Sequence, residues 1–92
     1  MEKQVIKGIS LLKNSAYRRK ILESLSTANY LTPSEIAGKT KIRLNHISNF
    51  LKDLKENDLV VCLNDEEKRG RLYKITELGK KVVKEDGQNK SS

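Results

Sequence analysis

Apolar residues recur at helical spacing through the first third of the chain. Residues 3–13 carry one such stripe, interrupted by Gly8, which weakens a helix: Val5, Ile6, Ile9 and Leu12. A second stripe follows Asn14 and Ser15, which can cap a helix ending near residue 27: Tyr17, Ile21, Leu22 and Leu25. The charged residues between its members are expected to face water: Arg18, Arg19, Lys20 and Glu23. The pattern therefore predicts two amphipathic helices whose apolar sides must be covered.

Residues 32–35 hold the clearest helix start in the chain. Thr32 can accept a hydrogen bond as the N-cap, and Pro33 suits the first helical position, where no N–H is needed. Glu35 can reach back to complete a capping box. Residues 38–41 should break this helix, so we expect a short helix followed closely by another.

Residues 43–57 are predicted to form that next helix. Its apolar residues recur at intervals of three and four, and all four are expected to point inward: Leu44, Ile47, Leu51 and Leu54. Two helices joined by a turn of about four residues form a helix-turn-helix unit, in which the second helix keeps one polar face free.

Two short segments with strand character follow. Residues 59–63 are apolar and rich in β-branched types, and residues 71–75 alternate apolar with charged side chains, so they should pair as a hairpin. The polar segment 64–70 is long for a tight turn and should protrude. Thr76 can cap a last helix through Val82 and Val83. Residues 86–92 are polar and small, and we expect them to be disordered. The sequence thus predicts a single domain over residues 1–85, mainly α with a small antiparallel β-hairpin (α+β).

The charge of the chain narrows the choice of partner. Nineteen Lys and Arg against twelve Asp and Glu leave a net charge of +7 over 92 residues, which attracts polyanions. Nucleic acid is the first partner to consider, although a basic surface can also serve solubility alone. Binding to a membrane surface would need a long apolar helix face or a lipidation signal, and neither is seen.

Residue types exclude several other functions. Cys62 and His46 are the only cysteine and the only histidine, so no intrachain disulfide and no Cys/His zinc site can form, and we expect no metal. No glycine-rich phosphate loop or nucleophile and base pair is visible, so we expect neither an enzyme nor a cofactor. The charged N-terminus and the lack of a long apolar run argue against a signal peptide or membrane span, which indicates a cytoplasmic protein. Cys62 is interpreted as a small core residue, with redox sensing as the alternative.

The order of these elements resembles the winged helix-turn-helix transcription regulators of the MarR and ArsR-like kind. The segments that carry the resemblance are residues 31–37 (LTPSEIA), 46–54 (HISNFLKDL), 57–60 (NDLV) and 70–79 (GRLYKITELG). It implies a protein that binds double-stranded DNA as a homodimer, with residues 3–13 as a candidate dimer contact. Metal sensing of the ArsR-like kind is not implied, because Cys62 and His46 lie in different elements.

The resemblance places the helix at about residues 43–57 in the major groove and the segment 64–71, the wing, on the backbone or in the minor groove. Side chains suited to base edges are Arg43, Asn45, His46 and Asn49. Side chains suited to phosphates are Lys39, Lys41, Lys52 and Lys55, and in the wing Lys68, Arg69 and Arg71. The acidic half of the wing, residues 65–67, is expected to be directed away from DNA or to restrain nonspecific affinity.

A protein-interaction module is the alternative function. Winged helix domains also serve as adaptors or subunits that do not bind DNA, and the amphipathic segment 3–13 could seat on a partner. The aromatic residues are too scattered for a platform that stacks single-stranded bases: Tyr17, Tyr30, Phe50 and Tyr73.

Overall fold

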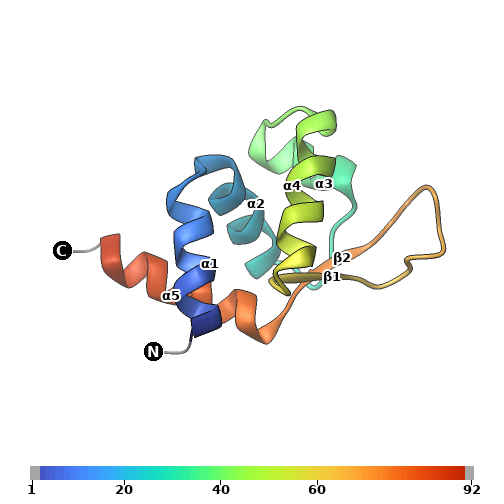
Figure 1. The fold of residues 1–92 in the computed structure, drawn as a ribbon. Coiled ribbons are helices and arrows are strands. Elements are labelled where there is room, and N and C mark those ends of the chain that lie inside the picture. The colour runs from blue at the N-terminus through green and yellow to red at the C-terminus, as the bar shows by residue number, and fades with distance from the viewer. Residues whose placement is uncertain (1–2, 91–92) are drawn as a thin grey trace.

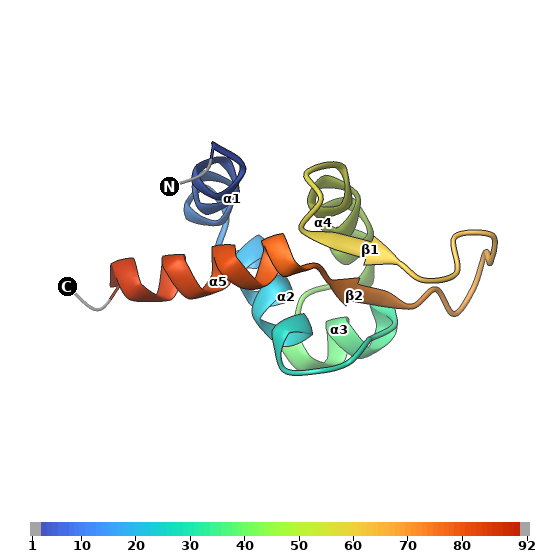
Figure 2. The same cartoon turned by 90° about the horizontal axis from the view of Figure 1, so that it is seen from below.

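The computed structural model describes residues 3–90, which form five helices and a two-stranded antiparallel sheet (Figure 1). The elements in order are α1 (Lys3–Lys13), α2 (Ala16–Ser26), α3 (Pro33–Thr40), α4 (Leu44–Glu56), β1 (Val60–Cys62), β2 (Tyr73–Ile75) and α5 (Glu77–Lys90). This arrangement confirms the predicted fold class. Both ends of the chain lie at one end of the molecule, and the loop between β1 and β2 projects at the other (Figures 1 and 2). Within residues 3–90, every helix is too short or too polar to span a lipid bilayer.

The predicted helix caps form as hydrogen bonds. The Ser15 hydroxyl accepts from the backbone N–H of Arg18 at 3.3 Å. At the start of α3 the Glu35 N–H donates to Thr32 Oγ1 at 3.2 Å, and the Thr32 N–H donates to Glu35 Oε1 at 2.9 Å, so the capping box is complete. Thr76 Oγ1 accepts a backbone N–H from the first turn of α5 at 2.9 Å. These local signals therefore fix where α2, α3 and α5 begin.

One apolar core joins all five helices and the hairpin. Its fully buried side chains are Leu12, Ile21, Leu22, Leu25, Ile36, Ile47, Leu51, Leu54, Leu59, Val60 and Val82. The members from α4 lie on one side of that helix, so its opposite side is left to solvent.

Helices α1 and α5 pack side by side (Figures 1 and 2). Gly8 is buried at this contact, and a Cβ atom there would lie 2.5 Å from Val82 Cγ2. Gly8, which was expected to weaken the first helix, therefore allows α1 and α5 to approach each other closely. Ile6 is 53% exposed, so the expectation that it shares the buried stripe of α1 is wrong.

The predicted disorder from residue 86 is wrong for residues 86–90, because α5 continues to Lys90. Asp86 is only 4% exposed and accepts hydrogen bonds from Arg19, at 2.8 Å from Nε and 3.3 Å from Nη2. An ion pair, rather than apolar burial, holds this turn of α5 on α2. The predicted domain boundary at residue 85 falls inside this helix, and the last two residues of the expected tail, 91 and 92, lie outside the described residues.

The expectation that Arg18 and Arg19 face water is also wrong. Arg18 Nη2 lies 3.1 Å from Asp53 Oδ2 of α4, and its Nη1 donates to the Leu11 carbonyl of α1 at 3.2 Å. Its guanidinium also lies 5.9 Å from the centre of the Phe50 ring. Arg18 thus connects α1 and α2 to α4.

The hairpin forms with shorter strands than predicted. Val60 pairs with Ile75 and Cys62 with Tyr73. Leu31 adds a single bridge to the free edge of β2, with both backbone bonds to Tyr73 formed, at 3.0 and 2.9 Å. The extended residue before α3 is therefore tied to the base of the wing.

Candidate nucleic-acid interface

Helices α3 and α4 are joined by a tight turn over residues 41–43. Lys41 adopts the left-handed conformation, with φ 64°, and its N–H donates to the Ala37 carbonyl at 2.9 Å. Ile42 is 6% exposed and anchors the turn in the core. The predicted break at residues 38–41 comes later than expected, because α3 continues through Thr40. The predicted helix-turn-helix unit is present, with α4 as its second helix.

The side of α4 that faces the core comprises Ile47, Leu51 and Leu54, each at most 1% exposed. Leu44 is 48% exposed, so the expectation that it points inward with them is wrong. It is the first residue of α4 and lies at the edge of the apolar stripe, where a groove opens instead of the core.

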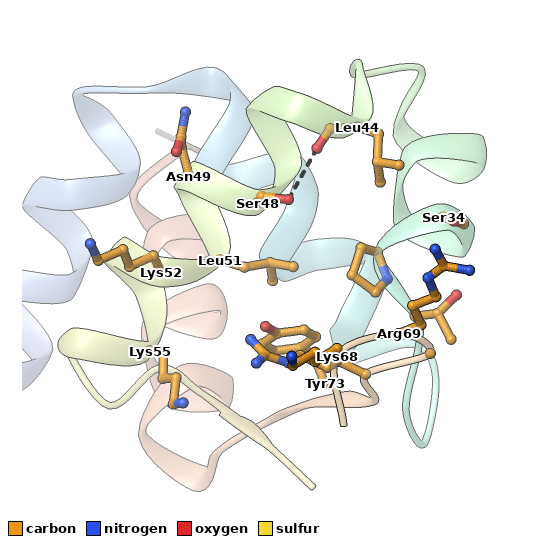
Figure 3. Close-up of a pocket in the computed structure, with 14 residues that line it drawn as sticks. Ser34, Leu44, Ser48, Asn49, Leu51, Lys52, Lys55, Lys68, Arg69 and Tyr73 are labelled. Carbon is orange, nitrogen blue, oxygen red and sulfur yellow. Dashed lines mark hydrogen bonds between the residues drawn. The ribbon is translucent and has the colours of Figure 1, made fainter. Parts of the chain in front are cut away.

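That groove, about 780 Å³ in volume, is bounded by α4, by the start of α3 and by the wing (Figure 3). It is lined by Thr32, Pro33, Ser34, Leu44, Ser48, Asn49, Leu51, Lys52, Lys55, Lys68, Arg69, Gly70, Arg71 and Tyr73. The buried side chains of Leu51 and Tyr73 form part of its wall. All five of its charged side chains are cationic, so the groove should attract an anionic ligand.

The structure brings five of the seven predicted phosphate-binding residues into this groove: Lys52, Lys55, Lys68, Arg69 and Arg71. Lys39 and Lys41 lie outside it. Lys39 borders a separate shallow hollow between α2 and α3. Both side chains are exposed, Lys39 in the last turn of α3 and Lys41 directly after it.

Of the four predicted base-reading residues, Asn49 alone lines the groove. Arg43, Asn45 and His46 are exposed but lie outside it. The His46 ring is 6.5 Å from that of Tyr17, so it lies toward α2. The groove therefore includes one of these four residues, and base contact by all four stays a prediction.

Leu44 and Ser48 are exposed groove residues on α4 that the sequence pattern did not predict. They are four residues apart and therefore share one side of the helix. Ser48 Oγ donates to the Leu44 carbonyl at 3.4 Å (Figure 3). The separation of four residues between Leu44 and Ser48 can be read from the sequence. Because Leu44 was expected to be buried, the pair was not recognised as part of a surface.

The wing is held by the side chain of Asn64. Its Oδ1 accepts the Leu72 N–H at 2.7 Å, and its Nδ2 donates to the Gly70 carbonyl at 3.2 Å. Gly70 has φ +66°, a conformation that glycine adopts without strain. Arg71 Nε donates to the Glu67 carbonyl at 2.6 Å, so this arginine helps to shape the loop as well as lining the groove.

An ion pair ties the wing to α4. Lys55 Nζ donates to Asp65 Oδ1 at 2.7 Å, and both side chains are solvent-accessible. This hydrogen bond raises the pKa of Lys55 and lowers the pKa of Asp65, so both are charged at neutral pH. Part of the acidic half of the wing is thus directed toward α4 and neutralises one groove lysine.

Metal-binding clusters and reactive thiols are the other candidate sites to consider in the described part of the chain. Among residues 3–90, no three His, Cys, Asp or Glu side chains gather as a metal site would require. Cys62 is a free, half-buried thiol whose Sγ lies 3.7 Å from Asn64 Oδ1.

No protein-family model and no curated protein match the chain, but solved structures do. A MarR family transcription regulator superposes with a TM-score of 0.77 at 22% identity, covering 95% of this chain and 58% of its own. The reduced form of MarR from E. coli gives 0.76 at 26% identity, with coverages of 98% and 67%. A mutant E. coli MarR complexed with operator DNA gives 0.73 at 28% identity, with coverages of 94% and 62%. This chain therefore spans about three-fifths of the length of these proteins, and it has the winged helix-turn-helix fold of the MarR family transcription regulators.

Proposed function

We propose that the protein is a transcription regulator that binds double-stranded DNA through α4 and the wing. The observation that carries this proposal is the groove between them, whose charged side chains are all cationic. The similarity to an E. coli MarR mutant complexed with operator DNA supports it. Such a protein would act in the cytoplasm, where a free thiol such as that of Cys62 stays reduced.

The dimensions and chemistry of α4 suit the major groove of B-DNA. An α-helix with its side chains is about 10–12 Å across, and the major groove is about 12 Å wide. Asn49 can bond to N6 and N7 of adenine, and Arg43, Asn45 and His46 are further candidates for base contacts.

We propose that the basic side chains bind phosphates of the DNA backbone on either side of the major groove. Lys52 would bind the backbone near α4, and Lys55 would do so by exchanging its ion pair with Asp65 for one with a phosphate. Lys39 and Lys41 would bind the backbone at the turn. From the wing, Lys68, Arg69 and Arg71 would reach the backbone or the minor groove.

Selection from a random pool of duplex DNA, followed by titration at several salt concentrations, tests the proposal. The logarithm of the affinity should fall steeply with the logarithm of salt concentration, because bound phosphates release counterions. Failure to enrich any sequence, with no tighter binding than an arbitrary basic protein shows, would instead favour the adaptor function.

Two variants separate backbone contacts from base contacts. Lys41→Asn removes a charge but keeps a residue that tolerates the left-handed conformation, and it should reduce the salt slope by about one unit on every sequence. Asn49→Ala should relax the preference at one base position and leave the slope unchanged. Lys20→Gln, at an exposed position on α2 outside both the groove and the proposed dimer helices, is the control that should change neither.

We further propose that the protein binds DNA as a homodimer through α1 and α5. These helices lie together at the end of the molecule away from the wing, and the exposed Ile6 offers an apolar contact there (Figure 1). Half-sites would then lie about 34–36 Å apart, one turn of DNA. Light scattering should show a dimer for the wild-type chain and a monomer for Ile6→Glu, which introduces a charge without touching the core. A wild-type monomer would contradict this assembly.

A further inference from the structure

Leu44 is an exposed leucine on the surface that the proposed function assigns to DNA. The large apolar side chains that are exposed among the described residues are Ile6, Tyr17, Tyr30, Leu44, Val61 and Leu63. Leu44 is the one of these that lines the groove.

The position of Leu44 gives it little part in folding. Its side chain is 48% exposed at the first position of α4, while Ile47, Leu51 and Leu54 hold the helix on the core. Its backbone carbonyl is the group that accepts the bond from Ser48. The side chain is therefore free to contact a ligand.

The surroundings of Leu44 indicate which part of DNA it would meet. In Figure 3 it lies on the side of α4 toward the start of α3, whereas Asn49 and Lys52 project on the other side. Pro33, also apolar, lines the groove as well, and its cationic side chains come from farther along α4 and from the wing. A phosphate would gain nothing from two apolar side chains.

Base edges in the major groove present hydrogen-bond donors and acceptors, and one apolar group, the C5-methyl of thymine. On the basis of the proposed function, we propose that Leu44 is a specificity-determining residue that contacts the C5-methyl group of a thymine in the target site. Asn49, on the other side of the helix, would then read a different base pair.

Replacement of thymine by deoxyuridine tests this inference, because it removes the methyl group and leaves the hydrogen-bonding groups unchanged. In a duplex selected by the wild-type protein, each thymine is replaced in turn and the dissociation constant is measured. Burial of one methyl group is worth about 0.8 kcal/mol. One replacement should therefore weaken wild-type binding about three- to fivefold.

The same replacement is repeated with two variants. Leu44→Ala should bind the thymine and deoxyuridine duplexes almost equally. Leu63→Ala removes the same atoms from a leucine of similar exposure, 51%, outside the groove, and should keep the wild-type ratio.

The outcomes distinguish this inference from the proposed function. If the wild-type protein selects no duplex, the proposed function fails. If it binds a selected duplex but is indifferent to every deoxyuridine, or if the sensitivity persists in Leu44→Ala, then the role of Leu44 alone is refuted.

Discussion

Replacement of Gly8 by alanine tests whether the contact between α1 and α5 is as close as the structure shows. In an isolated helix this change is favourable, by about 1 kcal/mol, because alanine has the higher helix propensity. In the folded protein the new methyl group would lie 2.5 Å from Val82 Cγ2, 3.2 Å from Cγ1 and 3.4 Å from Leu59 Cδ2. Helix propensity therefore predicts that Gly8→Ala stabilises the protein, whereas packing predicts that it destabilises the protein.

We expect the cost of overpacking to exceed the gain in helix propensity. The first distance is about 1 Å shorter than an ordinary carbon contact, and valine has little rotameric freedom with which to move away. Overpacking of this kind costs about 1–3 kcal/mol, and the gain in propensity offsets about 1 kcal/mol of it. We therefore expect Gly8→Ala to lower the free energy of unfolding by up to about 2 kcal/mol. For a domain of this size, each kcal/mol lowers Tm by about 4–8 °C.

Gly38→Ala is the matched control, since Gly38 lies in α3, where a new methyl group would meet no neighbouring side chain or element within 4 Å. That variant should raise the free energy of unfolding in urea by about 0.5–1 kcal/mol. In a Val82→Ala background, where space is available, Gly8→Ala should become stabilising. If Gly8→Ala stabilises the wild-type protein as much as Gly38→Ala does, the close packing of α1 on α5 is refuted.

Three further predictions concern polar contacts. Asp86→Asn should lower the free energy of unfolding in urea by about 1–3 kcal/mol, because it leaves the partly buried Arg19 without its counter-charge; a loss below about 0.5 kcal/mol would show that the pair is not formed. The Asp65 carboxyl should titrate by NMR below its ordinary pKa, so the stability from its bond to Lys55 is present above about pH 3.9 and is lost as the pH falls through the lowered pKa. Lys55→Met should return the pKa of Asp65 toward its ordinary value, and an unchanged titration in this variant would contradict the bond. Thr32→Ala should cost about 1 kcal/mol in thermal unfolding through loss of the α3 cap, whereas no change would mean that the capping box contributes nothing.

The sequence by itself determined the elements of this protein and their order. Caps such as those at Thr32 and Thr76 act within three residues, and the periodicity of Ile47, Leu51 and Leu54 depends on one helix alone. Both kinds of signal are local, so they can be recognised without knowing what packs against them. The net positive charge was equally visible, and it pointed to a polyanionic partner.

Only the tertiary structure decided which side chains face each other. Arg18 and Arg19 have partners 35 and 67 residues away in the chain, so nothing near them in the sequence marks them as paired. The same holds for Leu44, because helical periodicity gives a direction around the axis but not whether a core or a groove lies in that direction. The groove itself exists only where α4, the start of α3 and the wing meet, and that meeting depends on the packing of the whole chain.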